Sequence, residues 1–449
     1  ELKISKVKRR STTWLRGQPV DGVPRAKMSL YQGEDPECAK DDIERLAEAE
    51  IRLAHFQAEQ IRHATTYFGY PEVPENNDLS TLGVSGLARL HLNNAGDPWV
   101  HGSAQMHTKE FEREALAFVA DLYGIPDDYW GYTTSGGTEG NLYGMYMARE
   151  YFGAKGEPLV FIYSASSHYS IPKNARLLQL TTRTIECEPS GEMCYDALKK
   201  TLKEVETTWP ERPGLSISLN IGTTMTGAVD QVTRINDVLS VIGWPREKVL
   251  IHADAALLGL IYPFVEGSPD LFENGVSSIA VSGHKFAGTI HPCGIFLTKK
   301  SLHGQAFGDH WIPYVGTEDT TISGSRNGFL ALNLWYVLRK KGRHGLAREA
   351  RTCIENAEYL TKQLKEMNYP KVSMAPKQNI VVFQKPSDAM IKKYQLAAEG
   401  GIAHVVVMQH ITRSRIDRFC RDLRKSLDQA RFELRQDANI AAVGDGVEG

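Results

Sequence analysis

The sequence lacks the cysteine patterns of disulfide-rich and zinc-binding proteins. Its six cysteines stand far apart, and no two of them form a C-x-x-C pair. They are Cys38, Cys187, Cys194, Cys293, Cys353 and Cys420. We therefore expect reduced thiols and no metal site, because small disulfide scaffolds and clustered zinc sites both need closely spaced cysteines.

Long hydrophobic runs and an excess of one charge are also lacking. No stretch of the sequence approaches the roughly 18 consecutive apolar residues that a membrane span needs, and no apolar signal-peptide core stands near the N-terminus. The 52 Lys and Arg residues balance 54 Asp and Glu residues, which leaves a formal net charge of −2. Without a global positive field, neither a nucleic acid nor a membrane surface is expected as a partner.

The N-terminal sequence carries a basic run from Lys6 to Arg16 with little periodicity. Positive charges spread over this length are more typical of a solvated or subunit-wrapping arm than of a nucleic-acid tail. The first residue is Glu rather than Met, so we expect a longer natural chain in which a targeting segment can precede residue 1. With reduced thiols and no membrane span, the expected location is the cytoplasm.

The composition is that of an ordinary globular protein, with 42% hydrophobic and 24% charged residues. A helical pattern covers residues 41–63. From about residue 108 to 330, short apolar runs alternate with amphipathic segments, which predicts an α/β fold with a mostly parallel sheet covered on both faces. The strand candidates are Leu159–Tyr163, Leu215–Ile221, Lys248–His252, Ser278–Ser282 and Gly294–Thr298. The predicted domains are an N-terminal arm and helical segment (1–85), a large α/β domain (86–345) and a small α+β domain (346–449).

Paired glycines precede a helical segment in Thr134–Asn141. Free backbone N–H groups at the start of a helix, with the Thr138 hydroxyl, can bind a phosphate, and Gly136 and Gly137 let the anion approach the backbone. The segment lacks the lysine of a P-loop and the spacing of a dinucleotide fingerprint. Taken alone, it is either a phosphate site or a plain glycine turn.

Two of the predicted strands are followed by charged residues: Lys248–His252 by Asp254, and Ser278–Ser282 by Lys285. Asp254 stands amid small apolar neighbours and could pair with a protonated ring nitrogen, or it could cap a helix that starts at Ala255. Lys285 is a candidate imine-forming amine, because partial desolvation lowers the pKa of a lysine and exposes a nucleophile. Taken alone, most lysines of this kind are surface charges.

His168 follows another predicted strand, and it could lie flat over a ligand ring or serve as a hydrogen-bonded structural residue. The four segments together narrow the interpretation. A phosphate cradle, a carboxylate for a ring nitrogen, an imine-forming lysine and a planar stacking group are what pyridoxal 5′-phosphate requires. The sequence therefore predicts this cofactor.

At these segments the sequence resembles the group II pyridoxal-phosphate-dependent amino-acid decarboxylases, most of all the branch of bacterial histidine decarboxylases and plant serine decarboxylases. The resemblance runs from about Gly69 to about Arg415. The segments that carry it are Asn93–Pro98, Trp130–Tyr132, Ser135–Asn141, His168–Ser170, Gly222–Thr224, His252–Ala256, Ser282–Lys285 and Gly324–Gly328. It implies a fold-type-I enzyme with a mostly parallel seven-stranded sheet, helices on both faces, a small C-terminal α+β domain, and an active site at a homodimer interface.

The resemblance also implies roles for individual residues. Lys285 would bind the cofactor covalently, Asp254 would pair with its ring nitrogen, and His168 would stack on its ring. The other cofactor-binding residues that it implies are Gly136, Gly137, Thr138, Thr223, Ala256, Ser282, His284 and, contributed to the partner subunit, Ser325. Tyr314 matches the mobile-loop tyrosine that protonates the substrate carbon in related decarboxylases, so the implied catalytic residues are Lys285, Tyr314 and His168.

The implied reaction is the decarboxylation of an L-amino acid to its primary amine and CO2. The implied substrate-binding residues are Asn94, Trp99, Gln105 and Tyr314, and histidine is favoured slightly over methionine, valine, serine and other neutral amino acids. Ser282-Gly283 stands where the animal aromatic-amino-acid decarboxylases have Asn-Pro, which points away from an aromatic substrate. Two alternatives stay open: another fold-type-I reaction such as transamination or aldol cleavage, and a non-catalytic homologue that acts as a dimeric binding protein.

Overall fold

The computed structural model describes residues 36–74, 86–126, 128–308 and 310–444. The chain divides into two compact units, residues 1–62 and 63–449. The described part of the first unit is helical and belongs to α1 (Pro36–Ala64), which confirms the helix predicted over residues 41–63. Large apolar side chains of α1, such as Leu53 and Phe56, are exposed. The predicted basic arm lies outside the described residues.

The second unit is built around a seven-stranded sheet with the order β1-β7-β6-β5-β4-β2-β3. Strand β7 runs antiparallel to β1 and β6, and the other neighbours are parallel, which confirms the predicted fold class. The strands are β1 (Tyr129–Thr134), β2 (Leu159–Ser164), β3 (Thr181–Ile185), β4 (Gly214–Asn220), β5 (Val249–Ala255), β6 (Ser278–Ser282) and β7 (Gly294–Lys299). The sequence did not predict β3, because this partly exposed edge strand carries mostly polar residues.

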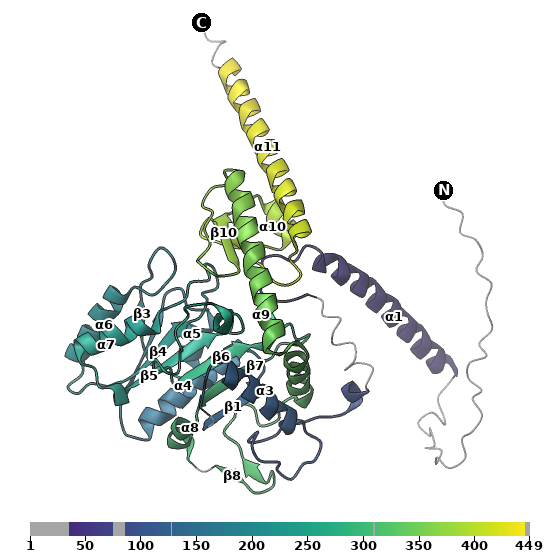
Figure 1. Ribbon diagram of the computed structural model, residues 1–449. Helices are drawn as coiled ribbons and strands as arrows, with labels where there is room; N and C mark the ends of the chain where they lie inside the picture. The colour runs from purple at the N-terminus through teal and green to yellow at the C-terminus, as the bar shows by residue number, and fades with distance from the viewer. Residues whose placement is uncertain (1–35, 75–85, 127, 309, 445–449) are drawn as a thin grey trace. The chain divides into compact units, whose positions relative to one another are not determined.

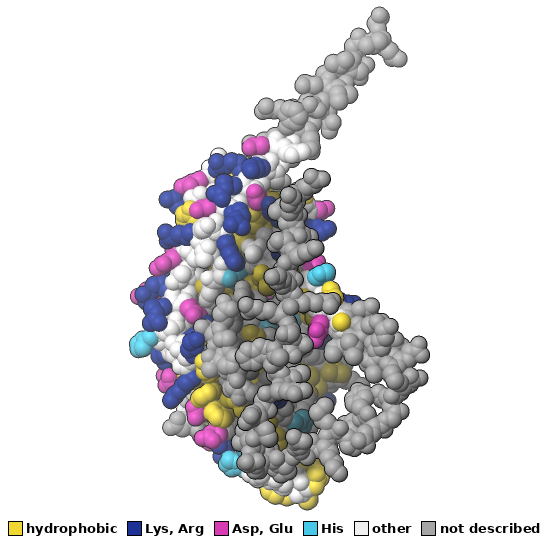
Figure 2. All heavy atoms as spheres, turned by 90° about the vertical axis from the view of Figure 1, so that its right-hand side faces the viewer, with side chains coloured by type: hydrophobic (Ala, Val, Ile, Leu, Met, Phe, Trp, Pro, Cys, Tyr) yellow, Lys and Arg dark blue, Asp and Glu magenta, His cyan; other side chains and the backbone are white. Residues whose placement is uncertain are grey.

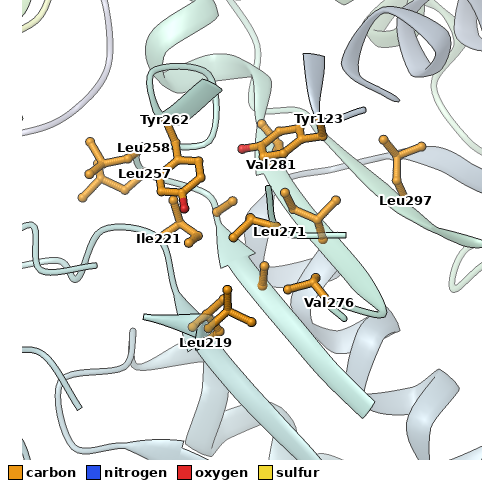
Figure 3. Packing of buried hydrophobic residues seen from close by; sticks show 14 of the residues in the cluster. Tyr123, Leu219, Ile221, Leu257, Leu258, Tyr262, Leu271, Val276, Val281 and Leu297 are labelled. Atoms are coloured by element: carbon orange, nitrogen blue, oxygen red, sulfur yellow. The ribbon is translucent and has the colours of Figure 1, made fainter. Parts of the chain in front are cut away.

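Helices cover both faces of the sheet, as Figure 1 shows. One face packs against α3 (Lys109–Leu122), α6 (Tyr195–Thr208), α7 (Val232–Ile242) and the first part of α9 (Gly328–Glu366). The other packs against α4 (Gly137–Gly153), α5 (Ser170–Leu177) and α8 (Lys300–Phe307). Because successive strand residues point to opposite faces, Ile295 and Leu297 of β7 enter the first core while Phe296 enters the second. Figure 3 shows part of the first core, where aliphatic side chains from several strands meet Tyr123 and Tyr262.

The C-terminal part of the second unit has its own core, which also takes in Phe68. It contains a three-stranded antiparallel sheet with the order β10-β12-β11. Its elements are β10 (Ile380–Gln384), α10 (Asp388–Tyr394), β11 (Ala397–Glu399), β12 (Ile402–Val406) and α11 (Arg413–Gly444). The long helix α9 reaches it from the large sheet and bends at Gly342, which has a φ of 60°. The three-part division at residues 85 and 345 stays a prediction.

Several short elements complete the fold. They are the hairpin strands β8 (Trp311–Ile312) and β9 (Thr317–Glu318), the 3-10 turns η2 (Leu87–Arg89), η3 (Arg246–Lys248) and η4 (Tyr262–Phe264), and the π-helical turn η5 (Gly283–Ala287). No helix within the described ranges is long and apolar enough to cross a membrane. On the face that Figure 2 shows, the Lys and Arg side chains that are coloured are interspersed with Asp and Glu side chains.

Candidate active site

A cavity of ≈ 480 Å³ lies where the loops after β1, β2, β4, β5 and β6 meet. Those strands are parallel, so their carboxyl ends meet at one edge of the sheet. Residues 69–72 and residues from the C-terminal sheet close the cavity from other sides. The predicted site residues that line it are Gly136, Gly137, Thr138, His168, Asp254, Ala256, Ser282, His284 and Lys285. The structure therefore brings together side chains that are far apart in the sequence.

The N-terminus of α4 forms a cradle for an anion in this cavity. Gly136 is the N-cap residue, and no side chain caps the helix, so the N–H groups of Gly137 and Thr138 have no acceptor within it. The Ser282 hydroxyl is buried without a hydrogen-bond partner in the part of the chain that the structure describes. A Cβ atom on Gly137 would lie 2.7 Å from Ala256 Cβ and 2.9 Å from Ser282 Oγ, so only glycine leaves the cradle open. These groups fit a phosphate.

Asp254, on β5, contributes a carboxylate to the cavity wall. Alternation along the strand turns Ala253 and Ala255 toward the first core, and thereby directs Leu250, His252 and Asp254 toward α4. Asn141 Nδ2 donates to Asp254 Oδ2 over 2.8 Å, and the backbone N–H of Ala256 donates to Oδ1 over 3.2 Å. The alternative that Asp254 caps a helix is wrong, because β5 continues through Ala255 and residues 256–261 form turns.

Lys285 lies in the π-helical turn η5, directly after β6. Burial lowers the pKa of its amine, while the carboxylates of Asp254 and Glu72 oppose this shift. The amine makes no hydrogen bond to any residue that the structure describes. A lysine in such surroundings spends more of its time as the neutral, nucleophilic amine than an exposed lysine does.

Two histidines face the same cavity. His168 is half-buried, its Nδ1 lies 2.8 Å from Ser170 Oγ, and burial lowers its pKa, so the ring is neutral at pH 7. His168 lines the cavity with Asp254 and Lys285, and the charges of both act on its pKa. His284 Nδ1 lies 2.8 Å from the Cys293 carbonyl oxygen, and burial lowers its pKa as well. Both rings can therefore serve as neutral hydrogen-bonding or stacking groups.

Some predicted residues lie elsewhere. Thr223 is buried and its hydroxyl accepts a hydrogen bond from the Ala228 N–H over 3.0 Å, whereas the next residue, Thr224, lines the cavity. Asn94 is fully buried, and its amide group is satisfied by neighbours. Glu112 accepts from its amide nitrogen over 2.8 Å, and Thr108 donates to its amide oxygen. Thr223 thus stabilises a turn beside the cavity, where it lines a neighbouring hollow together with His168 and Thr224, and Asn94 stabilises the loop before α3. Their predicted roles at the site stay predictions.

Four other predicted residues also do not line the cavity of their own chain: Trp99, Gln105, Tyr314 and Ser325. Tyr314 lies in the turn between β8 and β9 and is 86% exposed. Ser325 is exposed as well, and its hydroxyl accepts from Asn93 Nδ2 over 3.2 Å. The neighbouring Arg326 is buried instead, in an ion pair with Glu112.

Three polar residues of the cavity wall are among those to which the sequence did not point: Glu72, Asn141 and His404. Asn141 stood inside the glycine motif, but its function depends on the packing of α4 against β5, which the motif does not contain. Glu72 and His404 come from outside the large sheet, and His404 Nε2 lies 2.9 Å from the Gly69 carbonyl oxygen. No local pattern marks residues that reach a site from distant segments.

Comparisons with known proteins agree with this geometry. Residues 76–385 match the family described as "Pyridoxal-dependent decarboxylase conserved domain". The chain is 40% identical over 373 residues to "Serine decarboxylase 3" of Oryza sativa subsp. japonica, covering 82% of this chain and 80% of the relative. It is 40% identical over 361 residues to "Histidine decarboxylase" of Solanum lycopersicum, covering 80% and 84%. The crystal structure of L-methionine decarboxylase from Streptomyces sp. 590 superposes with a TM-score of 0.72 at 25% identity, covering 84% and 94%.

Proposed function

The chain belongs to the pyridoxal-dependent decarboxylase family and is a pyridoxal 5′-phosphate-dependent amino-acid decarboxylase, and we propose that histidine is its preferred substrate. Pyridoxal 5′-phosphate, when bound, supplies the electron-withdrawing ring that makes loss of CO2 possible. The cavity that holds Lys285, Asp254 and the α4 cradle together supports the use of this cofactor, and the observation that carries the preference for histidine is the Glu72 carboxylate in the same cavity wall.

The residues present fit this cofactor. We propose that the N–H groups of Gly137 and Thr138 and the unpartnered Ser282 hydroxyl bind its phosphate, together with His284. Asp254 would then keep the ring nitrogen protonated, Lys285 would attach the cofactor covalently, and His168 would lie against the ring. The same fixed groups would orient the substrate so that the bond between its Cα and its carboxylate can break.

A carboxylate in the cavity wall supports a substrate with a cationic side chain. Glu72 lines the cavity, Tyr67 donates to its Oε2 over 3.0 Å, and its charge acts on both Lys285 and His284. Of the amino acids considered, histidine alone carries a side chain that this carboxylate can attract in its charged form. Serine, methionine and valine offer no such charge.

Replacing Glu72 by glutamine is expected to lower kcat/KM for histidine about tenfold and to leave neutral amino acids within about twofold, because only the imidazolium loses an attraction. The measurement is amine formation by the cofactor-loaded protein from each of the twenty amino acids in turn. The matched control is Tyr67→Phe, which removes the hydrogen bond to Glu72 and keeps its charge. A wild-type preference for a neutral amino acid, or an unchanged selectivity in Glu72→Gln, would contradict the proposal.

We also propose that the enzyme is a homodimer in which each subunit contributes Tyr314 and Ser325 to the other subunit's cavity. Both residues are exposed and neither lines the cavity of its own chain, although both were expected at the site. Trp99 and Trp311 are exposed as well, and exposed aromatic side chains are typical of protein interfaces. In this arrangement the Tyr314 hydroxyl donates the proton that the substrate Cα needs after CO2 has left.

Mixing two inactive variants tests this arrangement. Lys285→Ala and Tyr314→Phe should each lose amine formation, since one removes the amine and the other the proton donor. If the subunits exchange, about half of the dimers become mixed and each regains one intact site, so about a quarter of the wild-type activity should return. Amine and keto or aldehyde products are quantified before and after mixing. No recovery in a sample that contains mixed dimers would show that each site uses its own Tyr314.

A cytoplasmic location is part of the proposal. Its support is the state of the cysteines: Cys187, Cys194, Cys293, Cys353 and Cys420 are free thiols. Free thiols are typical of proteins in reducing compartments.

A further inference from the structure

A chain of three buried polar side chains leads from the interior of the sheet to Asp254. His252 Nδ1 lies 2.8 Å from Ser278 Oγ, His252 Nε2 lies 3.0 Å from Asn141 Oδ1, and Asn141 Nδ2 lies 2.8 Å from Asp254 Oδ2. Ser278, His252 and Asn141 are each at most 2% exposed. Burying three polar groups in a row destabilises the folded protein unless each of them makes its hydrogen bonds. This row ends on the Asp254 carboxylate.

The direction of each hydrogen bond follows from the chemistry of the groups. The carboxylate of Asp254 only accepts, so Asn141 must donate through Nδ2 and must turn its carbonyl oxygen toward His252. That oxygen only accepts, so His252 carries its proton on Nε2. Burial lowers the pKa of His252 to about 4, which leaves the ring neutral and its Nδ1 without a proton. The Ser278 hydroxyl therefore donates to Nδ1, and all three protons point toward Asp254.

The packing of α4 holds this chain in place. Residues 137, 140 and 144 of α4 are glycines, and they lie where the helix approaches β5 and β6. A Cβ atom on Gly144 would overlap the His252 ring, and one on Gly140 would lie 2.8 Å from Ala280 Cβ. The close approach thus brings Asn141 within reach of both His252 and Asp254, and the lack of a side chain at Gly144 leaves room for the His252 ring.

We propose that Ser278, His252 and Asn141 are positioning residues that hold Asp254 ionised and oriented, so that a shared proton stays on the cofactor nitrogen rather than moving to the carboxylate. A donor to the charged form of a carboxylate makes it a weaker base. Donors aligned in one direction strengthen one another. The charge of Asp254 acts on three titratable groups of the surrounding elements, His252 of β5, His168 after β2 and Lys285 after β6. The inference rests on the proposed pairing of Asp254 with the ring nitrogen.

The test loads the protein with pyridoxal 5′-phosphate labelled with ¹⁵N in the ring and measures the ¹⁵N chemical shift without substrate. Asn141→Leu should move the shift toward that of a neutral nitrogen and lower kcat at least about tenfold, with KM changed less than about twofold. Ser278→Ala should act in the same direction by about two- to threefold, and Ser278→Thr should restore both values. The matched control is Asn356→Leu, which removes another buried amide donor, to the Ile411 carbonyl oxygen, away from the cavity.

The outcomes separate this inference from the proposed function. A neutral ring nitrogen in the wild-type protein would overturn the pairing with Asp254 itself. A protonated nitrogen in the wild type that stays protonated in both Asn141→Leu and Ser278→Ala would overturn the positioning chain alone. If Asn141→Leu does not fold, Ser278→Ala and Ser278→Thr decide: equal shifts in these two variants count against the chain, and a loss restored by threonine supports it.

Discussion

Lys285→Ala should lose covalent attachment of the cofactor and lower turnover at least about 10⁴-fold, because no other lysine of the described residues lines this cavity. Lys285 is the lysine of the cavity wall, and burial makes its amine a better nucleophile at neutral pH. The measurement is the mass of the protein after borohydride reduction, which fixes an attached cofactor, together with amine formation.

The matched control for this variant is Lys109→Met. Lys109 is 1% exposed and burial lowers the pKa of its amine to about 8, but it donates to the Val100 carbonyl oxygen and does not line the cavity. The control should keep the mass of the attached cofactor. A Lys285→Ala protein that still gained this mass, or that still formed amine at the wild-type rate, would refute the assignment of Lys285.

Asp254→Asn should lower kcat about 10³-fold, because an amide cannot hold a proton on the ring nitrogen as an ionised carboxylate does. Binding of the cofactor should weaken as well, since a buried charge pair is lost. The measurements are the steady-state rate, the cofactor dissociation constant and the absorbance of the bound cofactor between pH 5 and 9.

Asp230→Asn provides the matched control for the loss of a buried carboxylate. Asp230 is 2% exposed and accepts from Asn220 Nδ2 over 2.7 Å, much as Asp254 accepts from Asn141. It also accepts from the Met193 backbone N–H over 2.7 Å, outside the cavity. Asp230→Asn should lower stability without changing the absorbance of the bound cofactor. Equal effects of the two substitutions on kcat and absorbance would contradict a specific role for Asp254.

Much of the fold could be predicted because strand and helix periods are local. Four of the five predicted strands differ from the observed ones by a few residues at their ends, and Ser278–Ser282 matches β6. The strand around Asp254 proved longer than predicted, since small residues continue β5 through Ala255. The sequence did not predict the polar edge strand β3, because a strand at the edge of a sheet does not require an apolar run.

The sequence by itself determined the α/β alternation and the cofactor motif, because backbone periodicity and the chemistry of Gly136, His168, Asp254 and Lys285 can be read locally. Only the tertiary structure decided which neighbours these residues have. It placed Thr224 in the cavity wall, and it gave the buried Asn94 hydrogen bonds to Glu112 and Thr108. It also brought Glu72 and the Asn141–His252–Ser278 chain to the site. Asn141 lies more than 100 positions before its partners His252 and Asp254, so these contacts depend on how α4 packs on β5, which no local pattern records.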